Sequence, residues 1–237
     1  LVVESLRTAP NYLAYFNQLI GDHRTAYRHL VGSSLDWGQD LPGLSAWLRE
    51  HDLDNTAHEN ASAESSEDEP DAKSRPKVFF SYYGSALPEH YGIDAARLPG
   101  FPDFAEPRIP EPLDEGVYCV SATMLANLYS SFPGSWTRKY ETVYQQLVNN
   151  LRVFDSTAGN LEARKSLIAQ TGDHFWLQIF RQYEQARMAR LCSYLRQREP
   201  NAEINYSILI YRLNDEQLSR ALHERPVELI GDGPTTP

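Results

Sequence analysis

Short apolar runs alternate along the chain with longer stretches in which apolar residues recur three and four positions apart. The short runs are rich in β-branched and aromatic residues, which favour strands, and they cover residues 27–31, 77–83, 116–121 and 205–213. The longer stretches have helical spacing, and they cover residues 4–20, 40–51, 123–130, 140–200 and 215–224, with a short helical turn at 88–91. This alternation predicts an α/β fold with a layered, mixed or mostly parallel sheet of about four to five strands covered by helices. The long helical segment is expected between the last two of these strands.

Residues 54–76 break the pattern, because this stretch is rich in acidic residues and contains no large apolar side chain. A segment of this composition cannot bury enough surface to offset the entropy lost on ordering. Both of its flanks match parts of one sheet, so we expect a flexible acidic insertion rather than a linker between two folding units. The sequence therefore predicts a single α/β domain over residues 1–225, followed by a disordered tail rich in Pro, Gly and Thr at 226–237.

Residues 98–112 also lack a regular pattern, and they contain five prolines. Proline removes a backbone donor and disfavours both helix and central strand, so this stretch is expected to be irregular.

The formal net charge of −10 makes nucleic acid a poor partner, because phosphate binding needs a basic surface. The sequence contains no apolar run of the roughly eighteen residues that a membrane-spanning helix requires. The chain begins at Leu1 without an initiator methionine, so we expect it to be a piece of a longer protein.

The sequence contains two cysteines, Cys119 in a predicted strand and Cys192 in a predicted helix. Burial as free thiols is the expected state of cysteines in such positions, although the sequence leaves open whether these two pair. The histidines are scattered, and no sequence of the form CxxC, GxSxG or HExxH occurs. We therefore expect no metal site and no cofactor.

The turn between the predicted strand 27–31 and the predicted helix 40–51 is the first candidate site, since ligands bind in open α/β sheets where a strand leads into a helix. It contains two carboxylates, an amide and an indole: Asp36, Trp37, Gln39 and Asp40. Carboxylate and amide oxygens accept hydrogen bonds from hydroxyl groups, and an indole face can pack on a sugar ring. We expect Trp37 to be partly buried and the three polar side chains to point into a shallow cleft near Tyr83.

The same turn is also consistent with a purely structural corner. In that interpretation Asp40 is the N-cap of the helix and accepts hydrogen bonds from the backbone N–H groups of Gly43 or Leu44. Pro42 fits the first helical turn, where its lack of an N–H removes no intrahelical hydrogen bond, and Gly38 supplies a positive φ.

Two tyrosines and a serine extend the candidate site. Tyr83 and Tyr91 flank the same cleft as Trp37 if the strand 77–83 neighbours the first strand, and Ser121 lies at a second strand-to-helix transition. The alternative is that both tyrosines are core aromatics whose hydroxyl groups lie at the edge of the core.

Six sequence motifs occur in a distinctive order: PNYLAYFNQLIG at 10–21, LDWGQDL at 35–41, SYYGSALPEHYGI at 81–93, LPG at 98–100, VYCVSATML at 117–125 and YLRQREPNAEINYSILIYRL at 194–213. In this order they resemble the C-terminal, extracytoplasmic region of bacterial membrane glycosyltransferases of the protein O-mannosyltransferase-like class, glycosyltransferase family 39. Those enzymes take sugar from a polyprenyl-phosphate carrier. The chain departs from the family's pattern at Gly32 and Ser34, where Asp and Asn are usual, and at Asn205, where Gly is frequent.

The resemblance implies a soluble accessory domain on the extracytoplasmic (periplasmic) face of the cell membrane, anchored through the N-terminal transmembrane module of the same enzyme. The catalytic carboxylate of such enzymes is expected in a loop between early membrane helices, so no residue of this sequence takes over that role. The domain itself is therefore expected to be non-catalytic, and the acceptor glycan and the lipid-linked sugar carrier are its candidate ligands.

Two other functions remain open at this point. The chain could be a non-catalytic glycan- or protein-interaction domain of the cell envelope. It could also be a free-standing glycoside hydrolase that uses Asp36 and Asp40 as acid and base on either side of a glycosidic bond. Carboxylates at a helix start more often act as caps and surface charges, which favours the non-catalytic functions.

Overall fold

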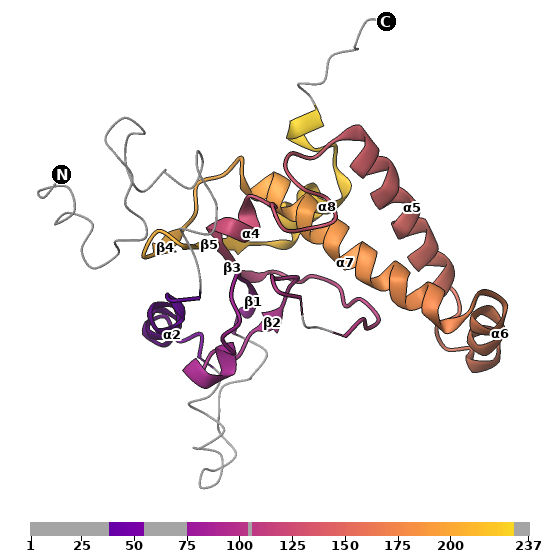
Figure 1. Ribbon diagram of the computed structural model, residues 1–237, viewed down its shortest axis with the longest axis horizontal. Helices are drawn as coiled ribbons and strands as arrows, with labels where there is room; N and C mark the ends of the chain where they lie inside the picture. The colour runs from indigo at the N-terminus through magenta and orange to yellow at the C-terminus, as the bar shows by residue number, and fades with distance from the viewer. Residues whose placement is uncertain (1–37, 55–74, 104–105, 230–237) are drawn as a thin grey trace, which may run out of the picture.

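The computed structural model describes residues 38–54, 75–103 and 106–229, which form a central sheet flanked by helices (Figure 1). The predicted helix 4–20, the predicted strand 27–31 and most of the acidic stretch 54–76 lie outside the described residues. In the predicted tail, Val227–Leu229 (η6) forms a 3-10 turn and Leu229 is buried, so the expectation of disorder was wrong for this part. The turn is ordered because Glu228 pairs with Arg196.

The sheet has five strands in the order β2-β1-β3-β5-β4. Their bounds are Lys77–Ser81 (β1), Ala96–Arg97 (β2), Gly116–Ser121 (β3), Ala202–Ile204 (β4) and Ile208–Leu213 (β5). β1 is parallel to both β2 and β3, whereas β5 is antiparallel to β3 and to β4. The predicted α/β fold with a mixed sheet is therefore confirmed. β3 is central and all six of its residues are buried, because neighbouring strands and both layers of helices surround it.

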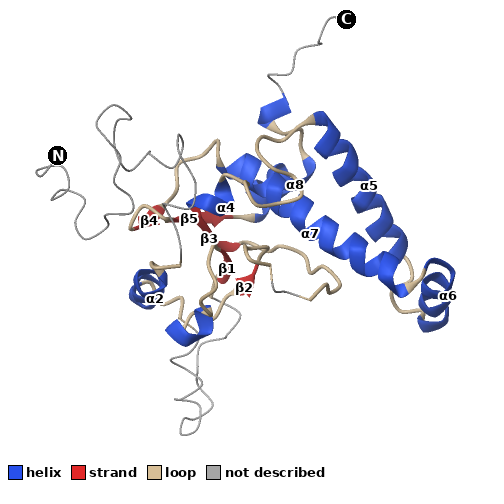
Figure 2. Ribbon diagram, in the orientation of Figure 1, coloured by secondary structure: helices blue, strands red, loops and turns tan. Residues whose placement is uncertain are grey.

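Helices cover both faces of this sheet, as Figure 2 shows by colour. Their bounds are Leu41–Glu50 (α2), Pro88–Tyr91 (η5), Ala122–Leu125 (α4), Arg138–Asp155 (α5), Leu161–Thr171 (α6), Asp173–Leu195 (α7) and Asp215–His223 (α8). Successive strand residues point to opposite faces, so Phe80 packs under α2 while Phe79 packs under α7 and α8. Within the described residues, no helix is both long enough and apolar enough to cross a membrane.

The residues on either side of the predicted acidic insertion pack in the same buried cluster. Leu53, just after α2, and Val78 in β1 belong to the same buried cluster beneath α2. The sequence expectation that both flanks belong to one sheet-containing unit therefore agrees with the packing of the residues on either side.

α5 and α7 pair side by side and extend away from the sheet, with α6 at their outer end (Figure 1). A third buried cluster holds this arm together, and it is rich in aromatic residues such as Trp136, Tyr144, Phe154 and Trp176. α6 buries none of its residues. The helical stretch predicted over 140–200 is divided in the structure, because α5 ends at Asp155 and α6 ends at Thr171.

Two element ends differ most from the sequence expectations. The helix expected over 123–130 ends at Leu125, because Asn127 adopts a left-handed conformation with φ +57° and its side chain donates to the Phe132 carbonyl. The strand expected over 205–213 begins at Ile208, because Asn205 and Tyr206 form a left-handed turn that reverses the chain from β4 into β5.

Candidate functional site

Asp40 is buried, with 6% of its surface exposed, and its carboxylate binds the turn between β4 and β5. Its Oδ1 accepts from Asn205 Nδ2 at 2.9 Å, and its Oδ2 accepts from the hydroxyl of Ser207. Gln39 adds a third donor, with 3.1 Å between its Nε2 and Oδ2 of Asp40. The carboxylate thus holds the start of α2 against the left-handed turn.

The expectation that the Asp40 side chain caps α2 was wrong, because this side chain makes no capping hydrogen bond. Instead, the backbone carbonyl of Asp40 accepts from Leu44 N–H at 2.9 Å. Pro42 does lie in the first helical turn, and Gly38 does have a positive φ of +80°. A Cβ on Gly38 would lie 3.2 Å from the ring of Tyr82, so the turn passes close to the end of β1.

The other predicted site residues do not join Asp40 in one cleft. Tyr83 is buried in the cluster under α7, on the opposite face of the sheet from α2, and its ring stacks on Phe101. Ser121 is fully buried and caps α4 by accepting from Met124 N–H at 3.3 Å. Tyr91 is 38% exposed at the end of η5, Gln39 is exposed, and Asp36 and Trp37 lie outside the described residues.

A cavity of about 550 Å³ lies beside the edge of the sheet, and we call it the proline-loop cavity. Its walls are the end of β1 with residues 84–88, the edge strand β2 with the proline-rich loop, and the outer face of α7. Its volume falls within the range of small-molecule sites, about 300–1,000 Å³. The proline-rich stretch 98–112, which the sequence predicts to be irregular, therefore forms one wall of this cavity.

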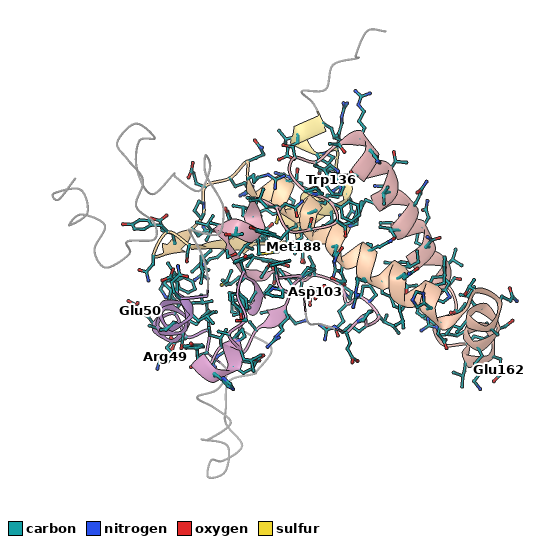
Figure 3. The ribbon with its side chains drawn as sticks, in the orientation of Figure 1. Arg49, Glu50, Asp103, Trp136, Glu162 and Met188 are labelled. Carbon is teal, nitrogen blue, oxygen red and sulfur yellow. The ribbon has the colours of Figure 1, made fainter. Side chains whose placement is uncertain are left out.

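Backbone hydrogen bonds hold the loop against β1 and preform the cavity wall. Phe101 N–H donates to the Tyr82 carbonyl at 3.1 Å, and Gly84 N–H donates to the Phe101 carbonyl at 2.8 Å. A Cβ on Gly100 would lie 2.8 Å from the carbonyl oxygen of Tyr82, so glycine permits this close approach. Figure 3 shows Asp103, from the same loop, lying between the sheet and α7.

Charged groups of both signs line the proline-loop cavity: Arg97, Arg108, Arg181, Arg187, Asp103, Glu106, Glu111 and Glu184. Arg187 is buried and donates to both carboxylate oxygens of Glu184, at 2.6 and 2.7 Å. In contrast, Arg108, Arg181 and Glu106 make no hydrogen bond or ion pair with any part of the chain that the structure describes. These three groups are therefore available to a ligand.

The two cysteine thiols are poor candidates for a nucleophile. Cys119 and Cys192 are free and buried on opposite faces of the sheet, and burial raises the pKa of each thiol to about 12. Both thiols therefore stay protonated near neutral pH, a form that is a poor nucleophile. Among residues 38–54, 75–103 and 106–229, no group of three or more His, Cys, Asp or Glu side chains could hold a metal ion.

Sequence reasoning singled out Asp40 and Tyr83, but it missed Arg108 and Arg181, which face the cavity. One sequence signal did mark the region, because loops longer than about 12 residues without regular structure are uncommon and are usually functional or disordered. No family model, no curated protein and no solved structure matches this chain.

Proposed function

We propose that this chain is a non-catalytic domain that binds a neutral saccharide in the proline-loop cavity. The observation that carries the proposal is the cavity itself, where Arg108, Arg181 and Glu106 lack partners among the described residues. With the motif resemblance, this supports an accessory domain of a membrane glycosyltransferase that uses a lipid-linked sugar. Its place would be the extracytoplasmic face of the membrane, next to the enzyme's own transmembrane module.

The chemistry of the lining favours a sugar over a purely apolar or a highly charged ligand. A sugar ring presents C–H groups that pack on apolar surfaces such as Tyr82 and Leu87, and hydroxyl groups that both donate and accept. Arginines supply donors for those hydroxyls, and carboxylates supply acceptors. The four arginines of the lining are balanced by four acidic residues, so a neutral ligand leaves no excess charge in the cavity.

The burial and the hydrogen bonds of Asp40 support the proposal that the domain is non-catalytic. A glycoside hydrolase needs one carboxyl group that protonates the leaving oxygen and a second that attacks or activates water. Asp40 is buried, and its two oxygens already accept from Gln39, Asn205 and Ser207. We therefore expect the purified chain to turn over no aryl glycoside and no lipid-linked sugar, and activity that disappears in Asp40→Asn would support the hydrolase alternative.

Binding of a saccharide library to the purified chain tests the proposal. Saturation-transfer NMR identifies a ligand, and calorimetry then gives its affinity for the chain and for two arginine variants. Arg181→Gln should weaken binding by about tenfold, since a hydrogen bond to a charged group contributes about 1.5 kcal/mol or more. Arg152→Gln is the matched control, because Arg152 is exposed on α5 and lies outside the proline-loop cavity.

Salt dependence separates a neutral saccharide from an anionic ligand. Screening by salt weakens the attraction of exposed arginines for an anion but has little effect on hydrogen bonds to neutral hydroxyl groups. The affinity for a neutral saccharide should therefore change little between low and physiological salt. The proposal would be wrong if no saccharide in the library binds, or if Arg181→Gln binds the ligand as tightly as the unchanged chain.

A further inference from the structure

A second cavity of about 350 Å³ lies on the other side of the loop 99–103, between α4 and α7, and we call it the tyrosine cavity. Four residues line both cavities: Pro99, Gly100, Asp103 and Gln185. The two hollows are therefore neighbours that share the loop as their common wall. Figure 3 shows Asp103 and Met188, which both line the tyrosine cavity, next to one another at this junction.

Phe101 and Tyr129 line the tyrosine cavity, and their rings form an aromatic cluster with the ring of Tyr83. Tyr129 lies 4.8 Å from Phe101 and 5.0 Å from Tyr83, measured between ring centroids, and Phe101 in turn stacks on Tyr83 at 5.4 Å. Tyr83 is only 8% exposed, whereas Tyr129 is 37% exposed. The buried ring of Tyr83 and the partly buried ring of Phe101 thus fix the orientation of the Tyr129 ring, which remains open to a ligand.

Gln185 lines both cavities, and its amide group can donate a hydrogen bond at the point where they meet. Its Oε1 accepts from the hydroxyl of Ser131 at 2.6 Å, which orients the amide group. Its Nε2 donates to no other group in the described part of the chain. A ligand that crosses from one cavity to the other therefore meets an oriented N–H donor at the crossing point.

We propose that the two cavities are consecutive subsites for a neutral oligosaccharide that crosses the loop 99–103. One sugar unit binds among the charged groups of the proline-loop cavity, and a following unit packs its C–H face on Tyr129. Gln185 donates to a hydroxyl between them. This inference rests on the proposed function and deepens it, because the ligand becomes a chain of sugars, such as a glycan acceptor, rather than a single sugar.

Calorimetry with neutral oligosaccharides of increasing length tests the inference. The probes are manno-, malto-, cello- and chito-oligosaccharides, each from the monosaccharide to the hexasaccharide. In at least one series the affinity should rise by tenfold or more between the monosaccharide and the trisaccharide. Equal affinities for the monosaccharide and for all longer members of a binding series would overturn the two-subsite arrangement while leaving the proposed function intact.

Tyr129→Ala should weaken trisaccharide binding by about five- to tenfold, because an aromatic contact of about 1 kcal/mol or more is lost. The same substitution should leave monosaccharide binding unchanged. Tyr91→Ala is a matched control, because Tyr91 is 38% exposed yet lines neither cavity. Trisaccharide binding that is equally weakened in Tyr91→Ala, or unaffected in Tyr129→Ala, contradicts the proposal.

Two further variants guard against a loss that comes from misfolding. Tyr129→Phe keeps the ring and should retain the trisaccharide affinity, and Gln185→Ala changes a residue on the surface of α7 and should lower it. If Gln185→Ala keeps full trisaccharide affinity, no hydrogen bond is made at the crossing point and the proposed path is wrong. Two results together support both subsites. Arg181→Gln should weaken the binding of monosaccharide and trisaccharide alike, and Tyr129→Ala should weaken the binding of the trisaccharide only.

Discussion

Arg190 of α7 binds the carboxylate of Glu141 of α5 through two hydrogen bonds, with 3.0 Å from Nε to Oε2 and 3.2 Å from Nη2 to Oε1. Arg190 is only 1% exposed and also donates to the backbone carbonyls of Ala221 and Glu224, at the end of α8. Trp136 Nε1 donates to the same carboxylate at 2.7 Å. The pair therefore joins the outer arm of α5 and α7 to the helix that covers the sheet.

Glu141→Gln should lower the free energy of unfolding by about 3 kcal/mol, since a buried arginine then loses its charged partner. Chemical denaturation measures the change. Glu216→Gln is the matched control, because the Glu216–Arg220 pair is exposed and should contribute less than about 0.5 kcal/mol. Equal effects of the two substitutions would show that the buried pair has no special importance for stability.

The same pair predicts how stability depends on pH. Burial opposes ionisation of Glu141, but hydrogen bonds from Arg190, Gln145 and Trp136 outweigh it, so the pKa of this carboxyl group lies below its ordinary value of 4.5. A group with a lowered folded-state pKa stabilises the protein above its ordinary pKa, and this contribution is lost as the pH falls through the folded-state value. The stability difference between the unchanged chain and Glu141→Gln should therefore shrink below pH 4.5. A difference that stays constant down to about pH 3 would argue against ionisation of Glu141 as its source.

Residue spacing in the sequence predicted the main helices and strands but not the ion pairs that join them. Position 190 lies in the helical stretch predicted over 140–200, and the structure buries it. A buried arginine needs several partners, however, and those of Arg190 come from positions 31 to 49 residues away in the sequence. The spacing of apolar residues indicates which face of a helix or strand is buried. It does not identify the partners that the tertiary fold brings to that face.

The candidate site illustrates the same limit. The sequence correctly marked the start of α2 as a polar corner. It offered Asp40 as a ligand-binding group, a helix cap or a catalytic carboxylate, and none of these roles involved the β4–β5 turn. That turn supplies Asn205 and Ser207, which lie 165 and 167 residues further along the chain. Tyr129 carried no sequence signal either, because its importance comes from stacking on Phe101 across an irregular loop.

Gly116 is expected to be essential for the pairing of β1 with β3. A Cβ at this position would lie 2.3 Å from the backbone carbonyl oxygen of Lys77, the residue opposite it in the register. Gly116→Ala should therefore force the two strands apart and lower the free energy of unfolding by about 3 kcal/mol or more.

Gly134→Ala is the comparison for this prediction. Gly134 has a φ of +74°, and apart from its chain neighbours no atom of the described residues lies within 4 Å of the position that a Cβ would take. Alanine there meets only backbone strain of about 1–2 kcal/mol. Thermal unfolding ranks the two variants. If Gly134→Ala is the more damaging substitution, close approach at Gly116 does not limit the stability of the sheet.

The role of Asp40 can be decided by comparing its effects on stability and on binding. Asp40→Ala leaves the fully buried hydroxyl of Ser207 without its Asp40 acceptor and also removes one hydrogen bond of Asn205. We expect the free energy of unfolding to fall by about 2–3 kcal/mol, since a buried polar group without a partner retains its full desolvation cost. Ser207→Ala in the same background should then cost less than it does alone, because the hydroxyl that lost its acceptor is removed. Saccharide affinity should stay unchanged in Asp40→Ala at temperatures where the variant is folded. If instead the variant keeps its stability and loses saccharide binding, Asp40 is a ligand-binding group rather than the anchor of α2.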